Sequence, residues 1–178
     1  ELFVGSTLRE DRSVLDLLTA DHTFVNEGLA RHYGIDGVFG PQFREVKLED
    51  QNRWGLLGKG AVLLRTSYGD RTSPVLRGAW IMDKLLGTPP TPPPPNVETD
   101  LTVHEGQPVT TIRARLEQHR ADASCNSCHG VIDPWGLALE NFDVTGRWRD
   151  VDLAANAPID ATTVLSSGEA VNGPVEMR

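Results

Sequence analysis

The stretch Cys125-Asn126-Ser127-Cys128-His129 decides the fold class of this chain, because it has the pattern C-x-x-C-H. On a helical segment, residues three apart lie on one face, so both thiols can reach the two vinyl groups of one porphyrin. The imidazole of His129 then follows as an axial ligand of the iron. The spacing therefore predicts one covalent haem c, held by Cys125 and Cys128 and ligated by His129.

Two other uses of the cysteine pair stay open. A thioredoxin-like dithiol normally lies between a strand and a helix, whereas a helix is predicted before Cys125 and a loop after His129. A structural zinc site needs a second pair of Cys or His ligands. The chain has 2 cysteines in total, and the rest of its 5 histidines are scattered, so these counts favour haem over zinc.

The opposite side of the iron has two candidate ligands. His119 lies a short stretch before Cys125, and the residues between them can turn the chain back toward the haem. Met177 follows the motif at a separation where a cytochrome methionine ligand is often found. We predict His119 as the second metal ligand. Met177, an open sixth position and a ligand from outside the chain remain alternatives.

Residues after the motif are expected to surround the cofactor. The segment 133–136 is near enough to offer a backbone carbonyl to the ring of His129. Trp135 is predicted to form an apolar haem wall, and Arg147 to pair with a propionate. Ordinary core packing of Trp135 and a surface position for Arg147 are the alternatives. Arg71 and Arg77 are further candidates for a propionate, and the alternative for the segment between them is capping of the following helix by Thr72 or Ser73.

The helical spacing of apolar residues, interrupted by glycines and prolines that mark loops, predicts a mainly helical chain. The predicted helices cover residues 13–18, 22–33, 55–65, 74–86, 108–120 and 137–142. Val46 and Leu48 alternate as strand residues do. Six prolines between Pro89 and Pro95 predict a polyproline strut over residues 88–96.

The predicted fold class is mainly α and loop-rich, with a cytochrome c-like haem domain that follows a small helical module. Residues 1–60 are expected to be the C-terminal part of an upstream helical module. Residues 61–155 are expected to form the haem c-binding module, and residues 156–178 to begin a following module.

The charge and hydrophobicity of the chain exclude some classes of binding partner and favour others. The chain has 178 residues, with 17 basic and 25 acidic side chains that leave a formal charge of -8. A groove that binds phosphates needs positive charge, so nucleic acid is excluded as the main partner. No apolar run approaches the ~20 residues of a transmembrane helix. The negative charge favours a basic redox partner protein or a cation-bridged neighbouring subunit.

Several segments of the chain resemble consecutive modules of the planctomycete-type multidomain exported proteins that contain cytochrome c. The segments that carry the resemblance are 8–26, 31–35, 71–80, 86–90, 117–120, 125–129, 133–136, 140–143, 158–160 and 173–178. The resemblance implies haem c at Cys125, Cys128 and His129, and it implies export to the periplasm or the cell exterior. It also places His119 in a recurrent His-Arg pair, and it implies a family that extends beyond both ends of the chain.

These observations together predict a haem c electron-transfer domain that relays electrons within a larger protein or assembly. One alternative is a peroxidase- or oxidase-like enzyme module with an open sixth iron position. Another is a structural subunit of an extracellular or membrane-attached assembly. No catalytic residue is predicted, because the chain has neither a hydrolase motif nor a Gly-rich phosphate loop.

Overall fold

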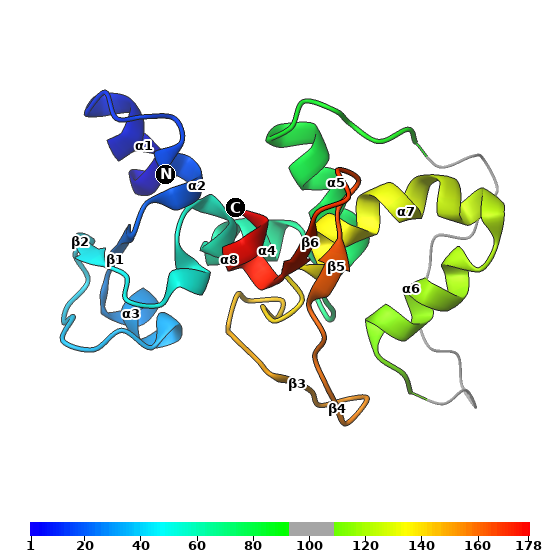
Figure 1. Cartoon of the computed structure of the whole chain (residues 1–178). Coiled ribbons are helices and arrows are strands. Elements are labelled where there is room, and N and C mark those ends of the chain that lie inside the picture. Colours follow the sequence, from blue (N-terminus) through cyan, green and yellow to red (C-terminus); the bar gives the residue numbers. More distant parts are fainter. Residues whose placement is uncertain (93–108) are drawn as a thin grey trace.

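Helix α7 (Ala123–Leu137) contains the whole Cys-His motif and is the longest helix of the described residues. The structure is a computed structural model that describes residues 1–92 and 109–178. Helix α5 (Pro74–Lys84) packs along α7, and α6 (Ile112–Arg120) packs against α7 from another side (Figure 1). These three helices position the motif.

The remaining elements are short. The other helices are α1 (Leu2–Arg9), α2 (Asp16–Thr19), α3 (Glu27–Tyr33), α4 (Gly60–Arg65) and α8 (Gly173–Met177), with 3₁₀ turns η1 (Gln51–Arg53) and η2 (Leu56–Gly58). The strands are β1 (His22–Val25), β2 (Arg44–Lys47), β3 (Val151–Asp152), β4 (Ala157–Pro158), β5 (Thr162–Val164) and β6 (Ala170–Asn172). They form three antiparallel two-stranded sheets in the order β1-β2, β3-β4 and β5-β6, and His22 pairs with Lys47 in the first.

Helix α5 forms where the sequence predicts it. The Ser73 side chain caps the helix by accepting a hydrogen bond from the backbone N–H of Leu76, and Pro74 occupies the first turn. A Cβ atom on Gly78 would lie 2.0 Å from the carbonyl oxygen of Ile132 in α7. The backbones of α5 and α7 are therefore in direct contact, which only glycine at position 78 permits.

The main core lies beneath these helices. Its buried residues are Leu57, Leu63, Ile81, Leu139 and Phe142. A second buried cluster, formed by Ile112, Leu116 and Leu137, joins α6 to α7. A third, formed by Ala138, Leu165 and Val171, holds the β5-β6 hairpin against the residues that follow α7. The end of α7 is thus fixed from several directions.

Two predicted elements are wrong in the structure. Residues 22–25 form β1, and the next helix begins at Glu27 behind Asn26, whose side chain accepts a hydrogen bond from the N–H of Leu29. The helix predicted over residues 22–33 is therefore confirmed only from Glu27 onward. The run of β-branched and aromatic side chains in β1 suits a strand that pairs with β2, and this pairing overrides the helix-like spacing of Phe24 and Val25.

The loop predicted after residue 130 is instead the second half of α7. Pro134 lies inside this helix and is buried. A proline in a helix interior removes one hydrogen bond and normally kinks or ends the helix. Close packing on α5 keeps the segment helical, so the predicted short helix at 137–142 is replaced by turns that begin after Leu137.

The N-terminal segment is bonded to the central part of the chain. The Tyr33 hydroxyl accepts a hydrogen bond of 2.8 Å from the N–H of Gly60. A ring nitrogen of His32 lies 2.8 Å from the carbonyl oxygen of Thr145, and the Arg53 guanidinium donates to the carbonyl of Gly146 at 2.9 Å. These long-range bonds connect α3, η1 and the 143–147 turn.

The overall content agrees with the predicted fold class. Helices account for 44% of the described residues and strands for 12%, so this part of the chain is mainly helical and loop-rich. Within the described residues, no helix has the length and apolar character needed to cross a membrane. Residues 88–92 are neither helix nor strand, and the rest of the predicted strut falls outside the described residues.

Candidate functional site

The first turn of α7 is capped by Asp122. Its carboxylate accepts hydrogen bonds from the N–H of Ser124 at 2.8 Å and from the N–H of Cys125 at 3.4 Å. The Ser124 hydroxyl also donates to this carboxylate, and this bond holds the pKa of Asp122 below its usual value. The cap fixes the start of the helix immediately before the motif.

Cys125 and Cys128 are free thiols one turn apart on α7. Both are half-buried, whereas Asn126 and Ser127 between them are exposed. Residues three apart on an α-helix lie on the same face. The helix therefore presents the two thiols together, as the sequence spacing predicts for two anchors of one group.

His129 is oriented by the carboxylate of Asp133, one turn further along α7. The two atoms that meet are His129 Nδ1 and Asp133 Oδ1, at 3.0 Å. A carboxylate accepts hydrogen bonds, so in the neutral imidazole the proton is on Nδ1 and the lone pair of Nε2 is free. The predicted backbone carbonyl is wrong: a side chain orients His129.

The orienting carboxylate is buried. Asp133 is 0% exposed, whereas the side chain of His129 is 21% exposed. Asp133 Oδ2 lies 3.8 Å from Nε of Arg120 and has no hydrogen-bond partner among residues 1–92 and 109–178. The i, i+4 spacing of His129 and Asp133 is the signal that reveals this pair, but only once the segment is recognised as helical.

His119 lies against His129. The ring centroids are 4.7 Å apart and the ring planes meet at 79°, an edge-to-face contact between the last turn of α6 and the first half of α7. The connection between α6 and α7 is short (Figure 1), and it brings the two rings together. The structure thus brings together both predicted iron ligands, while ligation by His119 stays a prediction.

The other predicted residues have partners elsewhere. Trp135 is half-buried and packs on the main core, and so does Met177. Arg147 is exposed and donates from Nε to Nδ1 of His32 at 3.2 Å. Contacts of Trp135 and Arg147 with a cofactor stay predictions.

Arg77 is fully buried and does not offer a free guanidinium. It donates to the carbonyl oxygens of Leu139, Phe142 and Asp143 at 2.8–3.0 Å. Glu140 Oε2 lies 3.8 Å from its Nη1. Burial lowers the pKa of Arg77 to about 10 and raises the pKa of Glu140. This arginine holds the turn after α7 against α5, so its predicted pairing with a propionate is replaced by a structural role.

The donor set at the start of α7 fits haem c. Two thiols one turn apart match the two attachment points, and an imidazole nitrogen with a free lone pair follows them. A structural zinc site is normally closed by four ligands. In the described parts of the chain, no three His, Cys, Asp or Glu side chains converge in a way that could hold a metal ion.

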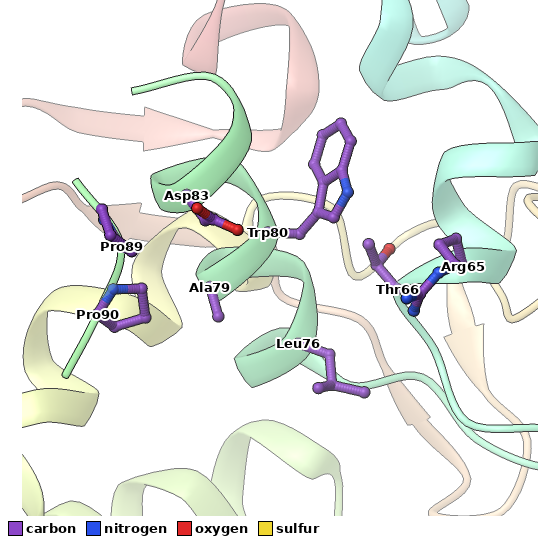
Figure 2. A pocket seen from close by; sticks show the side chains of 8 residues that line it. All are labelled: Arg65, Thr66, Leu76, Ala79, Trp80, Asp83, Pro89 and Pro90. Carbon is purple, nitrogen blue, oxygen red and sulfur yellow. The ribbon is translucent and has the colours of Figure 1, made fainter. Parts of the chain in front are cut away.

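A separate cavity of about 340 Å³ lies against α5 (Figure 2). It is lined by Arg65, Thr66, Leu76, Ala79, Trp80, Asp83, Pro89 and Pro90. Figure 2 shows Pro89 and Pro90 on the chain beside the last turns of the helix. The lining contains none of the predicted haem residues, so this cavity is distinct from the donor set on α7.

Comparison with known proteins identifies two families along the chain. Residues 53–152 match PSCyt3, protein of unknown function (DUF1588), and residues 1–35 match PSD4, protein of unknown function (DUF1592). Both names denote planctomycete-type domains associated with cytochrome c. No curated protein and no solved structure matches. Because the PSCyt3 match covers more than half of the sequence and includes the whole donor set, the chain belongs to the PSCyt3 (DUF1588) family.

Proposed function

We propose that this chain binds one haem c through Cys125, Cys128 and His129 and transfers electrons as a domain of an exported protein. One observation carries the proposal: two half-buried thiols share a helix face next to an imidazole whose Nδ1 is hydrogen-bonded to Asp133, which leaves Nε2 for a metal. Bound haem supplies an iron that carries one electron by changing between the ferric and ferrous states.

The residues of the chain have separate tasks in this proposal. Cys125 and Cys128 fix the position of the cofactor along α7, and the Asp122 cap keeps this part of the helix formed. His129 is the iron ligand, and its hydrogen bond to Asp133 holds the ring in one orientation. Packing of the C-terminal half of α7 on α5 fixes the end of the helix that lies beyond these groups.

His119 decides between the two main forms of the proposal. Its contact with His129 supports a second imidazole ligand and therefore a carrier whose iron has no open position. The alternative is an enzyme-like module with an open sixth position. Carbon monoxide added to the reduced protein distinguishes them, because prompt binding contradicts the closed carrier and an unchanged spectrum supports it.

The proposal also includes a location outside the cytoplasm and a place within a larger protein or assembly. Haem attachment to C-x-x-C-H takes place after export, so the location proposed is the periplasm or the cell exterior. The match to two cytochrome c-associated families in one chain supports a relay within a larger protein or assembly. The formal charge of -8 favours a redox partner with a basic docking surface.

The test is expression in an exporting bacterial host that contains the haem-attachment machinery. Wild type should retain haem on a denaturing gel and give the pyridine haemochrome spectrum of haem c. The double variant Cys125→Ser/Cys128→Ser should lose the covalent haem, while Asn126→Ser, a control between the two cysteines, should keep it. A wild type without covalent haem, or a double variant that retains it, overturns the proposal.

A further inference from the structure

The hydrogen bond between His129 and Asp133 has an unusual acceptor, because the carboxylate is entirely buried. Asp133 is 0% exposed, and its Oδ1 lies 3.0 Å from His129 Nδ1. Burial in a medium of low dielectric constant strengthens the interaction of a charge with its neighbours. Asp133 therefore acts on the His129 ring with little screening by water.

The surroundings of Asp133 place one cation near its carboxylate and, among the described residues, leave one of its two oxygens without a hydrogen bond. Arg120, on the last turn of α6, places Nε 3.8 Å from Asp133 Oδ2, a distance that allows charge attraction but no hydrogen bond. Oδ2 has no hydrogen-bond partner in the described parts of the chain. The hydrogen bond that Asp133 does make is thus directed at the imidazole.

We infer that Asp133 is a positioning residue that lowers the reduction potential of the iron at His129. The inference rests on the proposed function. An ionised acceptor on Nδ1–H increases the electron density of the ring and makes Nε2 a stronger donor. Such a donor stabilises ferric iron more than ferrous iron, because the ferric ion carries the larger positive charge. The Asp133 carboxylate therefore sets the potential through the imidazole, without touching the iron.

This role differs from simple orientation of the ring. In Asp133→Asn, the amide oxygen can still accept the bond from Nδ1–H, so the ring orientation is kept while the negative charge is lost. A purely structural role predicts an unchanged potential for this variant. An electrostatic role predicts a higher reduction potential for Asp133→Asn than for wild type, because loss of the negative charge removes a stabilisation of ferric iron.

The experiment is a redox titration of the haem-loaded protein, followed by absorbance. For Asp133→Asn we expect the ferrous form to be favoured at least tenfold over wild type at a fixed potential, which is about 59 mV for a one-electron couple. Asp133→Glu retains the charge and should lie nearer to wild type. Glu117→Gln makes the same carboxylate-to-amide change at an exposed site on α6 and should shift the potential much less.

The possible outcomes separate this inference from the proposed function. A wild type that contains no covalent haem contradicts the proposed function itself. Covalent haem in wild type and Asp133→Asn with equal potentials overturns only the role of Asp133. If Asp133→Asn fails to fold, Asp133→Ser takes its place, because the smaller hydroxyl side chain also removes the negative charge. A higher potential in that variant supports the inference, and an unchanged potential overturns it.

Discussion

Gly136 and Pro74 bring the backbones of α7 and α5 into contact: a Cβ atom at position 136 would lie 1.8 Å from the carbonyl oxygen of Pro74. With Gly78 against Ile132, this gives the two helices two points of direct backbone approach. Both points lie away from the cysteines, toward the C-terminal half of α7. The fixed end of the helix is thus opposite to the end that carries the motif.

Replacement of Gly136 by alanine should therefore destabilise the fold. The obstacle is backbone rather than a flexible side chain, so the helices must separate, and we expect a loss of about 1–3 kcal/mol or more. Gly130→Ala is the matched control on the same helix, since its nearest neighbour is the side chain of Asn126. It should be neutral or stabilising by up to about 1 kcal/mol. Urea denaturation measures both variants, and equal stabilities would contradict the close approach.

Arg77 should be among the most sensitive positions of the core. Arg77→Met removes the donor for three buried carbonyl oxygens and takes away one cation near Glu140, so we expect a loss of about 3–5 kcal/mol. Arg31→Met, which breaks an exposed i, i+4 pair with Glu27, should cost at most about 0.5 kcal/mol. Thermal unfolding of the two variants checks the contrast. Similar melting temperatures would argue against a structural role for Arg77.

Lys59 should make stability depend on pH. Its ammonium group is buried over the Phe3 ring and donates to the carbonyl oxygens of His22 and Arg53, and burial lowers its pKa to about 7. The unfolded lysine keeps a pKa near 10.5, so between pH 7 and 10 the unfolded chain binds one more proton than the folded chain. The contribution of Lys59 to the free energy of unfolding is therefore lowest below pH 7. Above pH 7 this contribution rises by at most about 1.4 kcal/mol per pH unit.

The measurement for Lys59 is the free energy of unfolding at pH 7, 8 and 9. Lys59→Met should reduce the slope with pH. Lys47→Met, at an exposed lysine beside Asp21, should leave it as in wild type. A slope that persists unchanged in Lys59→Met would assign the effect to other groups.

His119→Ala should change the spin state of the iron in the haem-loaded protein. If His119 is the second ligand, its loss should convert low-spin absorbance bands completely to high-spin bands. Iron bound by both imidazoles also requires the two rings, which now touch edge to face, to move apart. Gln118→Ala, on an exposed neighbour, is the control and should keep the wild-type spectrum. An unchanged spectrum in His119→Ala would eliminate this ligand.

An element of the fold can be predicted from the sequence when neighbouring residues determine it, and not when residues far along the chain do. Helix α5 is predictable because Ser73, Pro74 and Gly87 mark its ends and its apolar stripe is regular. Strand β1 is not, because Phe24 and Val25 suit helical spacing equally well and the pairing with β2 is set by residues far along the chain. Tertiary contacts decide such cases.

In the candidate site, too, some features can be predicted from local sequence and others depend on tertiary contacts. The motif and the adjacent His119 are evident from spacing alone, and the structure brings the two histidines together. The Asp133 side chain is not evident, because Pro134 suggests a loop at that point and a loop hides the i, i+4 relation to His129. Packing of α7 on α5 keeps the proline helical, and no local pattern contains that information.

The cysteines of α7 lie at the end of the helix that has the fewer buried contacts. Cys125 and Cys128 lie in the first two turns, whereas Gly136 and the buried Leu137 anchor the opposite end. The first turns can open locally while the anchored end remains in place, because regions with few buried contacts open at lower free energy. On the proposed function, attachment of the cofactor and folding of the domain are then separable steps, and an otherwise folded chain can offer both thiols to the attachment machinery.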